Sequence, residues 1–246
     1  MIFVIVLIIT AVRIKSMDSH RISGRILAEN IAGPGMLRLV EQSMQARARK
    51  TSVTEIAVKE RKHPQAALTF DDGPDIRYTP LLLDGLKERN VRVSFFLLGE
   101  KVEQYPELVE RMQKEGHLVG NHTYHHVQLN KLNETKAREE ILKTNNLIYE
   151  TTGVYPLYLR PPFGAWKKNL ELCVEMLPVF WTIDTLDWKV QNTEKIVRTV
   201  QEKIEDGAII LMHDEYDTSV EAALQVADDL KAQGYQLVTV DQLILP

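Results

Sequence analysis

Two adjacent aspartates, Asp71 and Asp72, stand where an apolar stretch breaks into a turn. Residues 66–70 before them predict a short buried strand, and Gly73 with Pro74 is a strong turn signal. Because neighbouring side chains that leave a strand point in different directions, one carboxylate can bind a metal while the other handles a proton. Asp, Gly and Pro also dominate ordinary turns, so the pair alone does not exclude a plain turn.

A second group of metal-ligating side chains follows a later apolar stretch. His122 and His126 are four residues apart, so two imidazoles can face one metal if the segment turns helically, and Asp72 is a candidate third ligand. Two histidines and one carboxylate leave positions open for water and substrate, as in hydrolytic zinc sites, although other divalent metals also suit this set. A single pair at this spacing is often accidental. Spacing does not exclude His125, which would point elsewhere if His122 and His126 share a face.

Three further polar groups each follow a predicted strand. Arg160 precedes two prolines and either orients a carboxylate or is a surface arginine in a rigid loop. Asp187, beside Trp188, either orients a proton-transfer partner next to a sugar-stacking ring or caps a helix beside a core aromatic. His213 ends an apolar strand, where an imidazole either acts as a general acid near neutral pH or has a structural role.

The elements that must position these side chains alternate regularly from residue 65 onward. Short apolar runs predict buried strands, and longer amphipathic runs between them predict helices. The predicted strands are 66–70, 93–98, 118–120, 157–159, 179–183, 208–212 and 236–240, and the predicted helices are 79–89, 105–115, 134–151, 168–176, 193–205 and 220–233. This alternation implies parallel strands with helical crossovers and favours a barrel of the (β/α) type over an open sheet. Because chemistry in such barrels gathers at the carboxyl ends of the strands, we expect the polar groups to form one site.

Five short motifs stand in order along the chain: TFDDGP (69–74), HTYHH (122–126), RPPFG (160–164), DTLDW (184–188) and LMH (211–213). In this order they resemble the motifs of the NodB-type polysaccharide deacetylases, a carbohydrate esterase family. The resemblance covers about residues 65–245 and does not plausibly arise by chance, so the local alternatives above lose most of their weight together. It implies an α/β fold, a distorted and incomplete (β/α) barrel of about seven parallel strands.

The resemblance also implies roles for the acidic and metal-ligating residues. Asp71 would be the general base and would pair with Arg160. Asp72, His122 and His126 would hold one divalent metal, usually zinc in this family, with cobalt, manganese or nickel as alternatives.

The resemblance further implies that His213 would be the general acid, oriented and tuned by Asp187. The backbone N–H of Phe163 would help to form an oxyanion hole, and Phe163, Trp188 and Leu211 would line the pocket for the acetyl methyl. The third motif of the family often has Tyr where this chain has Phe163, but a backbone donor does not need the hydroxyl.

The expected function is that of a metal-dependent hydrolase, a polysaccharide N-deacetylase. It would remove N-acetyl groups from the amino sugars of an acetylated glycan polymer or oligomer and release acetate, with peptidoglycan the preferred substrate and chitin oligomers next. Two alternatives are a catalytically silent glycan-binding module on the same fold and a deacetylase of a small N- or O-acetylated substrate.

Composition narrows the classes of partner. The chain has 246 residues, of which 44% are hydrophobic and 26% charged, as in an ordinary globular domain with a short extension. The net charge is -4, whereas phosphate binding needs a clustered cationic face, so nucleic acid is not an expected partner. The single cysteine, Cys173, excludes an intramolecular disulfide and a cysteine-based zinc site. We expect a monomer.

The N-terminal residues differ in kind from the rest. Residues 2–12 are almost uninterruptedly apolar, the length of a signal-peptide core and shorter than the roughly 20 residues that span a bilayer. We assign residues 1–20 to a signal peptide or short membrane anchor, 21–63 to a linker or helical extension, and 64–246 to the deacetylase domain. The expected location is extracytoplasmic, membrane-anchored or secreted. If Met17 is the true start, it is cytoplasmic, and a buried N-terminal strand is a further alternative.

Overall fold

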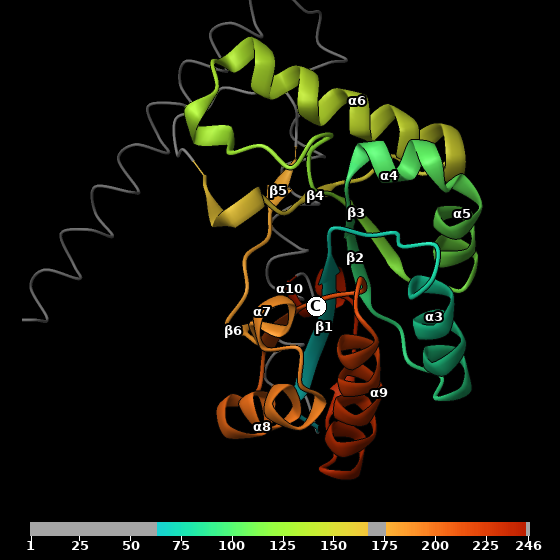
Figure 1. The fold of residues 1–246 in the computed structure, drawn as a ribbon, viewed down its shortest axis with the longest axis vertical. Coiled ribbons are helices and arrows are strands. Elements are labelled where there is room, and N and C mark those ends of the chain that lie inside the picture. The colour runs from blue at the N-terminus through green and yellow to red at the C-terminus, as the bar shows by residue number, and fades with distance from the viewer. Residues whose placement is uncertain (1–62, 167–175, 245–246) are drawn as a thin grey trace, which may run out of the picture. The chain divides into compact units, whose positions relative to one another are not determined.

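The computed structural model describes residues 63–166 and 176–244 of the chain. Strands and helices alternate along these residues, and Figure 1 shows the helices arranged around the strands. The strands are β1 (Gln65–Asp71), β2 (Ser94–Leu97), β3 (Leu118–Asn121), β4 (Tyr158–Leu159), β5 (Leu177–Pro178), β6 (Ile183–Asp184), β7 (Ala208–His213) and β8 (Gln236–Leu237). The helices are α3 (Thr79–Glu88), α4 (Gly99–Gln104), α5 (Pro106–Lys114), α6 (Glu134–Thr152), α7 (Asp187–Val190), α8 (Thr193–Lys203), α9 (Asp217–Ala232) and α10 (Val240–Ile244), with 3-10 turns η1 (Leu129–Lys131) and η2 (Pro162–Gly164).

The sheet is parallel and strongly curled. Its strands run in the order β5-β4-β3-β2-β1-β7-β6, with β8 beside the start of β1. Strands β5 and β6 form opposite edges of this path, yet only residues 179–182 separate them in the sequence. Five residue steps span at most about 17 Å, whereas a flat sheet of seven strands would hold its edges about 29 Å apart. The sheet must therefore curl, and the predicted distorted, incomplete (β/α) barrel is confirmed.

Of the predicted strands, 236–240 ends already at Leu237, since Val240 begins α10, and 179–183 is also wrong in its extent. The structure has two short strands instead: β5 pairs with β4 at one edge of the sheet, and β6 pairs with β7 at the other. Residues 179–182 cross from one edge to the other: the N–H of Val179 still donates to the carbonyl of Leu159 in β4, whereas that of Thr182 donates to the carbonyl of Ile209 in β7. A continuous apolar run does not reveal such a crossing, because apolar side chains are buried on either path.

Several predictions concern residues that the structure does not describe. The helix predicted at 168–176 lies outside the described residues except for its last residue, Met176. Cys173 and the assignments to residues 1–62 also lie outside them. Within 63–166 and 176–244, no helix combines the length and the apolar character needed to cross a bilayer.

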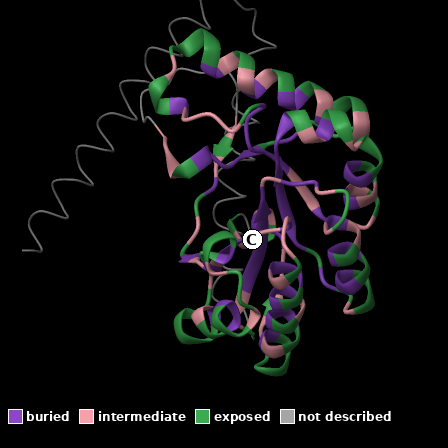
Figure 2. Ribbon diagram, in the orientation of Figure 1, coloured by how far each residue is buried: buried purple, intermediate pink, exposed green. Residues whose placement is uncertain are grey.

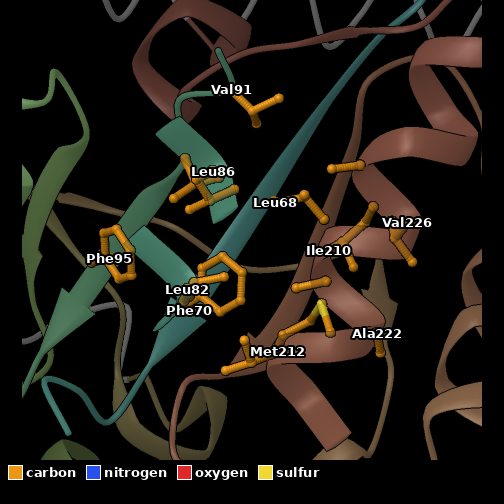
Figure 3. Packing of buried hydrophobic residues seen from close by; sticks show 14 of the residues in the cluster. Leu68, Phe70, Leu82, Leu86, Val91, Phe95, Ile210, Met212, Ala222 and Val226 are labelled. Atoms are coloured by element: carbon orange, nitrogen blue, oxygen red, sulfur yellow. The ribbon is translucent and has the colours of Figure 1, made fainter. Parts of the chain in front are cut away.

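Most of the core lies between the strands and the outer helices. Leu68 and Phe70 of β1 belong to this outer core, together with Leu82 of α3 and Val226 of α9 (Figure 3). Figure 2 shows the central strands buried and the outward faces of the helices exposed. Because side chains alternate along a strand, Ala67, Thr69 and Asp71 lie on the opposite, inner face of β1, and Ala67 packs there in a separate cluster. The pleat of β1 therefore sends Asp71 into the barrel.

The outer core gives a measurable expectation for stability. Ile210 of β7 is fully buried there, and Ile210→Val is expected to lower the free energy of unfolding by about 1 kcal/mol, since one methylene of packing is lost. Activity per folded molecule should not change, because the side chain lies on the face of β7 opposite to His213. Urea denaturation followed by circular dichroism measures the difference. An unchanged unfolding midpoint would contradict tight packing at this position.

Candidate active site

The polar residues that follow four of the strands meet at one edge of the sheet. In the parallel register, Asp71 at the end of β1 is the partner of His213 at the end of β7. Asn121 at the end of β3 is the partner of Leu159 at the end of β4, so His122 and Arg160 follow at the same level. The carboxyl ends of parallel strands share an edge, which is where such barrels carry their chemistry.

Arg160 fixes the orientation of Asp71 inside the barrel. Its Nη1 donates to Oδ1 of Asp71 at 2.7 Å and to Oγ1 of Thr69 at 2.7 Å, and both charged side chains are buried. The guanidinium also lies 4.2 Å from the ring centroid of Phe96. With Oδ1 engaged, Oδ2 of Asp71 faces Nε2 of His122 at 3.8 Å. Thr69 was not predicted as a partner of Arg160, although its place two residues before Asp71 on the same strand face was a usable signal.

Asp72, His122 and His126 form a compact group of ligand atoms, all within 4.8 Å of one another. Oδ1 of Asp72 lies 3.3 Å from Nε2 of His122 and 3.4 Å from Nε2 of His126. Nδ1 of His122 faces the backbone carbonyl of Arg160 at 2.6 Å, so this nitrogen carries the proton and donates it. Nε2 of His122 is therefore unprotonated in the neutral ring and is turned towards Asp72.

This donor set fits a divalent metal. Oδ1 of Asp72 is buried and accepts no well-aligned hydrogen bond, which is costly for a carboxylate unless a cation lies beside it. Burial alone would raise the pKa of Asp72, but the nearby imidazole of His122, with those of His126 and His213, holds it well below its usual range. Burial also lowers the pKa of His126, which favours the neutral form that can bind a metal. Two imidazoles and one carboxylate suit zinc and also other divalent metals.

His125, the alternative ligand, points away from this group. Its Nδ1 lies 2.8 Å from Oε1 of Glu140, and its side chain is mostly exposed. The expectation that His125 points elsewhere when His122 and His126 share a face is confirmed.

The turn after β1 places Asp72 by an uncommon backbone conformation. Asp72 has a φ of 69°, and the following Gly73-Pro74 peptide bond is cis. Glycine is needed at position 73, because a Cβ there would collide with the buried carboxylate of Asp214. The two neighbouring carboxylates both lie near His122, but only Asp71 pairs with Arg160 and only Asp72 also lies beside His126.

His213 is held by a buried carboxylate. Its Nδ1 lies 2.7 Å from Oδ1 of Asp187, and its backbone N–H donates to Oδ2 of the same residue at 2.7 Å. Burial alone would lower the pKa of His213, but the hydrogen bond and charge of Asp187, with the charges of Asp71 and Asp72, raise it to about 9. Nε2 of His213 points towards Asp72, 3.8 Å from Oδ2. Ser219 of α9 also donates to Asp187 at 2.7 Å, a contact for which the sequence carried no signal.

The three residues predicted to contact substrate lie around these groups. Phe163 has a φ of 60°, its ring centroid lies 4.5 Å from that of His126, and within the described residues its backbone N–H has no acceptor. Trp188 in α7 is 49% exposed, so its ring has room for a ligand. Leu211 is buried in β7, two residues before His213 and on the same strand face. Their contacts with substrate stay predictions.

Known proteins resemble this chain over the described region. A family model described as polysaccharide deacetylase matches residues 58–180. Peptidoglycan-N-acetylglucosamine deacetylase PgdA of Listeria monocytogenes is 41% identical over 185 residues, which are 75% of this chain and 40% of that protein. Peptidoglycan-N-acetylmuramic acid deacetylase PdaC of Bacillus subtilis is 43% identical over 177 residues, which are 72% of this chain and 38% of that protein.

The fold agrees with these similarities in sequence. The solved structure of peptidoglycan deacetylase PdaC from Bacillus subtilis matches with a TM-score of 0.72 and 42% identity, and the match covers 74% of this chain and 91% of that one. This chain spans about two fifths of the length of the two relatives. With five motifs gathered at one sheet edge, a matching family model and a shared fold, the chain belongs to the polysaccharide deacetylase family.

Proposed function

We propose that this chain is a metal-dependent hydrolase that removes N-acetyl groups from the amino sugars of peptidoglycan and releases acetate. The observation that carries the proposal is that Oδ2 of Asp71, whose carboxylate is held by Arg160, and Nε2 of His213, held by Asp187, each lie 3.8 Å from a residue of the metal group. The two relatives described above are named for different sugars of peptidoglycan, so the proposal covers both N-acetylglucosamine and N-acetylmuramic acid.

Asp71 is the general base of this proposal. Because Arg160 occupies Oδ1, the free Oδ2 is the atom that takes a proton from the attacking water. A divalent metal held by Asp72, His122 and His126, zinc in first place, supplies Lewis-acid chemistry that polarises the acetamide carbonyl and makes a nearby water more acidic.

His213 is the general acid that lets the amine leave. An amine is a poor leaving group until it is protonated, and the raised pKa of His213 keeps a proton on Nε2 at neutral pH. The backbone N–H of Phe163 has no acceptor within the described residues, so it is free to donate to the oxyanion, and losing such a donor typically costs about 3 kcal/mol of barrier. Trp188 and Leu211 complete the proposal as contacts for the sugar and the acetyl methyl.

Location and domain boundaries belong to the same proposal. A chain that acts on peptidoglycan works outside the cytoplasm, either secreted or held at the membrane by residues 1–20. The boundaries 1–20, 21–63 and 64–246, and the monomeric state, stay predictions.

A substrate panel tests the proposed function. The folded, zinc-loaded chain is incubated with peptidoglycan, chitin oligomers, an O-acetylated glycan and a small N-acetylated amine, and released acetate is measured for each. We expect the highest kcat/KM on peptidoglycan. Glycan binding without acetate release would support the silent module instead, and preference for the small amine or the O-acetylated glycan would overturn the assignment to N-acetylated polysaccharide.

The pairing of His213 with Asp187 predicts a shift in pH dependence. A general acid must hold its proton, so activity is lost as the pH rises through the pKa of His213. Asp187→Asn removes the charge that raises this pKa, so the alkaline limb of the kcat profile is expected to move to lower pH, with a lower maximum. Ser219→Ala, which removes one hydrogen bond to Asp187 and keeps the charge, is the matched control and should shift the limb less. An alkaline limb that stays in place in Asp187→Asn would refute this role.

A further inference from the structure

The loop that carries the two histidine ligands has a backbone that does not form readily by itself. Residues 122–127 follow β3, and two of them lie in the left-handed region, Thr123 at a φ of 67° and His126 at 54°. Such a conformation costs on the order of 1–3 kcal/mol for a residue other than glycine, and it persists only where the surroundings enforce it. Contacts outside the loop must therefore hold it.

Glu140 of α6 supplies three of these contacts. Its Oε2 accepts the backbone N–H of Tyr124 at 3.0 Å and that of His125 at 2.9 Å, while Oε1 lies 2.8 Å from Nδ1 of His125. Two consecutive N–H groups that converge on one oxygen form an anion-binding nest. Hydrogen bonds from N–H groups to a carboxylate are stronger than those to a neutral acceptor.

Helix α6 is a rigid support for this carboxylate. Asn133, just before the helix, caps it by accepting the N–H of Lys136, and Gly153, just after it, caps the other end in the left-handed conformation. The residue after Glu140, Ile141, is fully buried, and its carbonyl accepts a hydrogen bond from the side chain of Asn121 just before the loop. The helix and the loop are thus joined at both Asn121 and the two N–H groups.

We infer that Glu140 is a positioning residue for the metal group: by anchoring the N–H groups of Tyr124 and His125, it aims His122 and His126 at Asp72. Within the described residues, no hydrogen bond or ion pair joins Glu140 to Asp72, His122 or His126, so it acts through the backbone between the two ligands. The inference rests on the proposed function only in that this group binds a metal.

Other contacts keep the loop folded without Glu140. The carbonyl of Thr123 accepts the N–H of Gly99, and the hydroxyl of Tyr124 donates to Glu103. Loss of the Glu140 carboxylate should therefore make the orientation of His122 and His126 less well defined while the domain stays folded.

Zinc affinity measures this effect directly. The chain is titrated with Zn²⁺ in competition with a chromophoric chelator, with no glycan present. Glu140→Ala is expected to raise the Kd for Zn²⁺ by about 10- to 100-fold. Glu140→Gln, which keeps an acceptor oxygen at the same distance, should restore affinity to within about threefold of the unaltered chain. At saturating Zn²⁺ the kcat of Glu140→Ala should recover, because the ligands themselves are intact.

Two neighbours provide matched controls. Glu139→Ala removes an exposed carboxylate from the same helix, and His125→Ala removes the imidazole while both N–H groups remain. Both should bind Zn²⁺ like the unaltered chain. The inference is wrong if Glu140→Ala keeps its affinity for Zn²⁺, or if Glu139→Ala loses as much affinity as Glu140→Ala. It is also wrong if neither the unaltered chain nor any variant binds Zn²⁺. Tight binding without acetate release would refute the proposed function and leave the role of Glu140 standing.

Discussion

Removal of the divalent metal is expected to lower acetate release by at least about a hundredfold, and adding back Zn²⁺ or another divalent metal should restore it. The reason is the group of Asp72, His122 and His126, which places one carboxylate oxygen and two imidazole nitrogens within 4.8 Å of one another. Oδ1 of Asp72 is buried without a hydrogen bond, as expected of an atom that a cation satisfies. Dialysis against a chelator, followed by acetate measurement before and after metal addition, gives the result.

Adjacent histidines make a matched pair of variants for this expectation. His126→Ala removes a predicted ligand, whereas His125→Ala removes an imidazole that points to Glu140. The first should lose metal and activity together, and the second should keep most of both. Full activity of the chelated chain, or equal losses in the two variants, would contradict the assignment of the metal group.

Replacing the general base is the second large effect. Asp71→Asn keeps the shape of the side chain and an oxygen for Arg160, but an amide cannot take a proton from water. We expect kcat to fall by roughly two to four orders of magnitude. Zn²⁺ affinity should change little, because Asp72 and the two histidines are intact. Steady-state kinetics together with a zinc titration distinguishes the base from a ligand.

The same substitution has a cost in stability that must be measured separately. Arg160 is fully buried, and Asp71 is its only ion-pair partner within the described residues. Removing the charge of one partner leaves the other buried without a counter-ion, which destabilises the fold. Thr69→Val is the control, since it removes the neutral acceptor of Arg160 and leaves Asp71 in place. Unchanged kcat in a folded Asp71→Asn variant would show that another group is the base.

Much of the architecture could be predicted, because strand and helix periodicities differ and alternate along the chain. The barrel type and the gathering of Asp71 and His213 at the carboxyl ends of the strands followed from the alternation of elements, whereas spacing alone left the direction of His125 open. The crossing at residues 179–182 did not, since an apolar run is buried whether it pairs along its length or only at its ends. Helix α4 was missed because six residues are too few to show a clear helical period.

The supporting contacts made by two helices could not be predicted. Glu140 and Ser219 lie on helices whose sequences indicate only which face is buried. Which polar side chain of a helix reaches a loop far away in the sequence depends on how the helix packs on the sheet. That information is absent from local sequence patterns, so supporting residues such as Glu140 and Ser219 are found only in the folded chain.

Conversion of peptidoglycan by the zinc-loaded chain tests the central proposal most directly. Purified peptidoglycan is treated with the enzyme, released acetate is quantified, and the digested fragments are analysed by mass spectrometry for free amino groups on each sugar. We predict equal amounts of acetate and new amine, both lost in Asp71→Asn. Neither acetate nor free amine from a folded chain that has bound zinc would contradict the proposal that it is a peptidoglycan N-deacetylase.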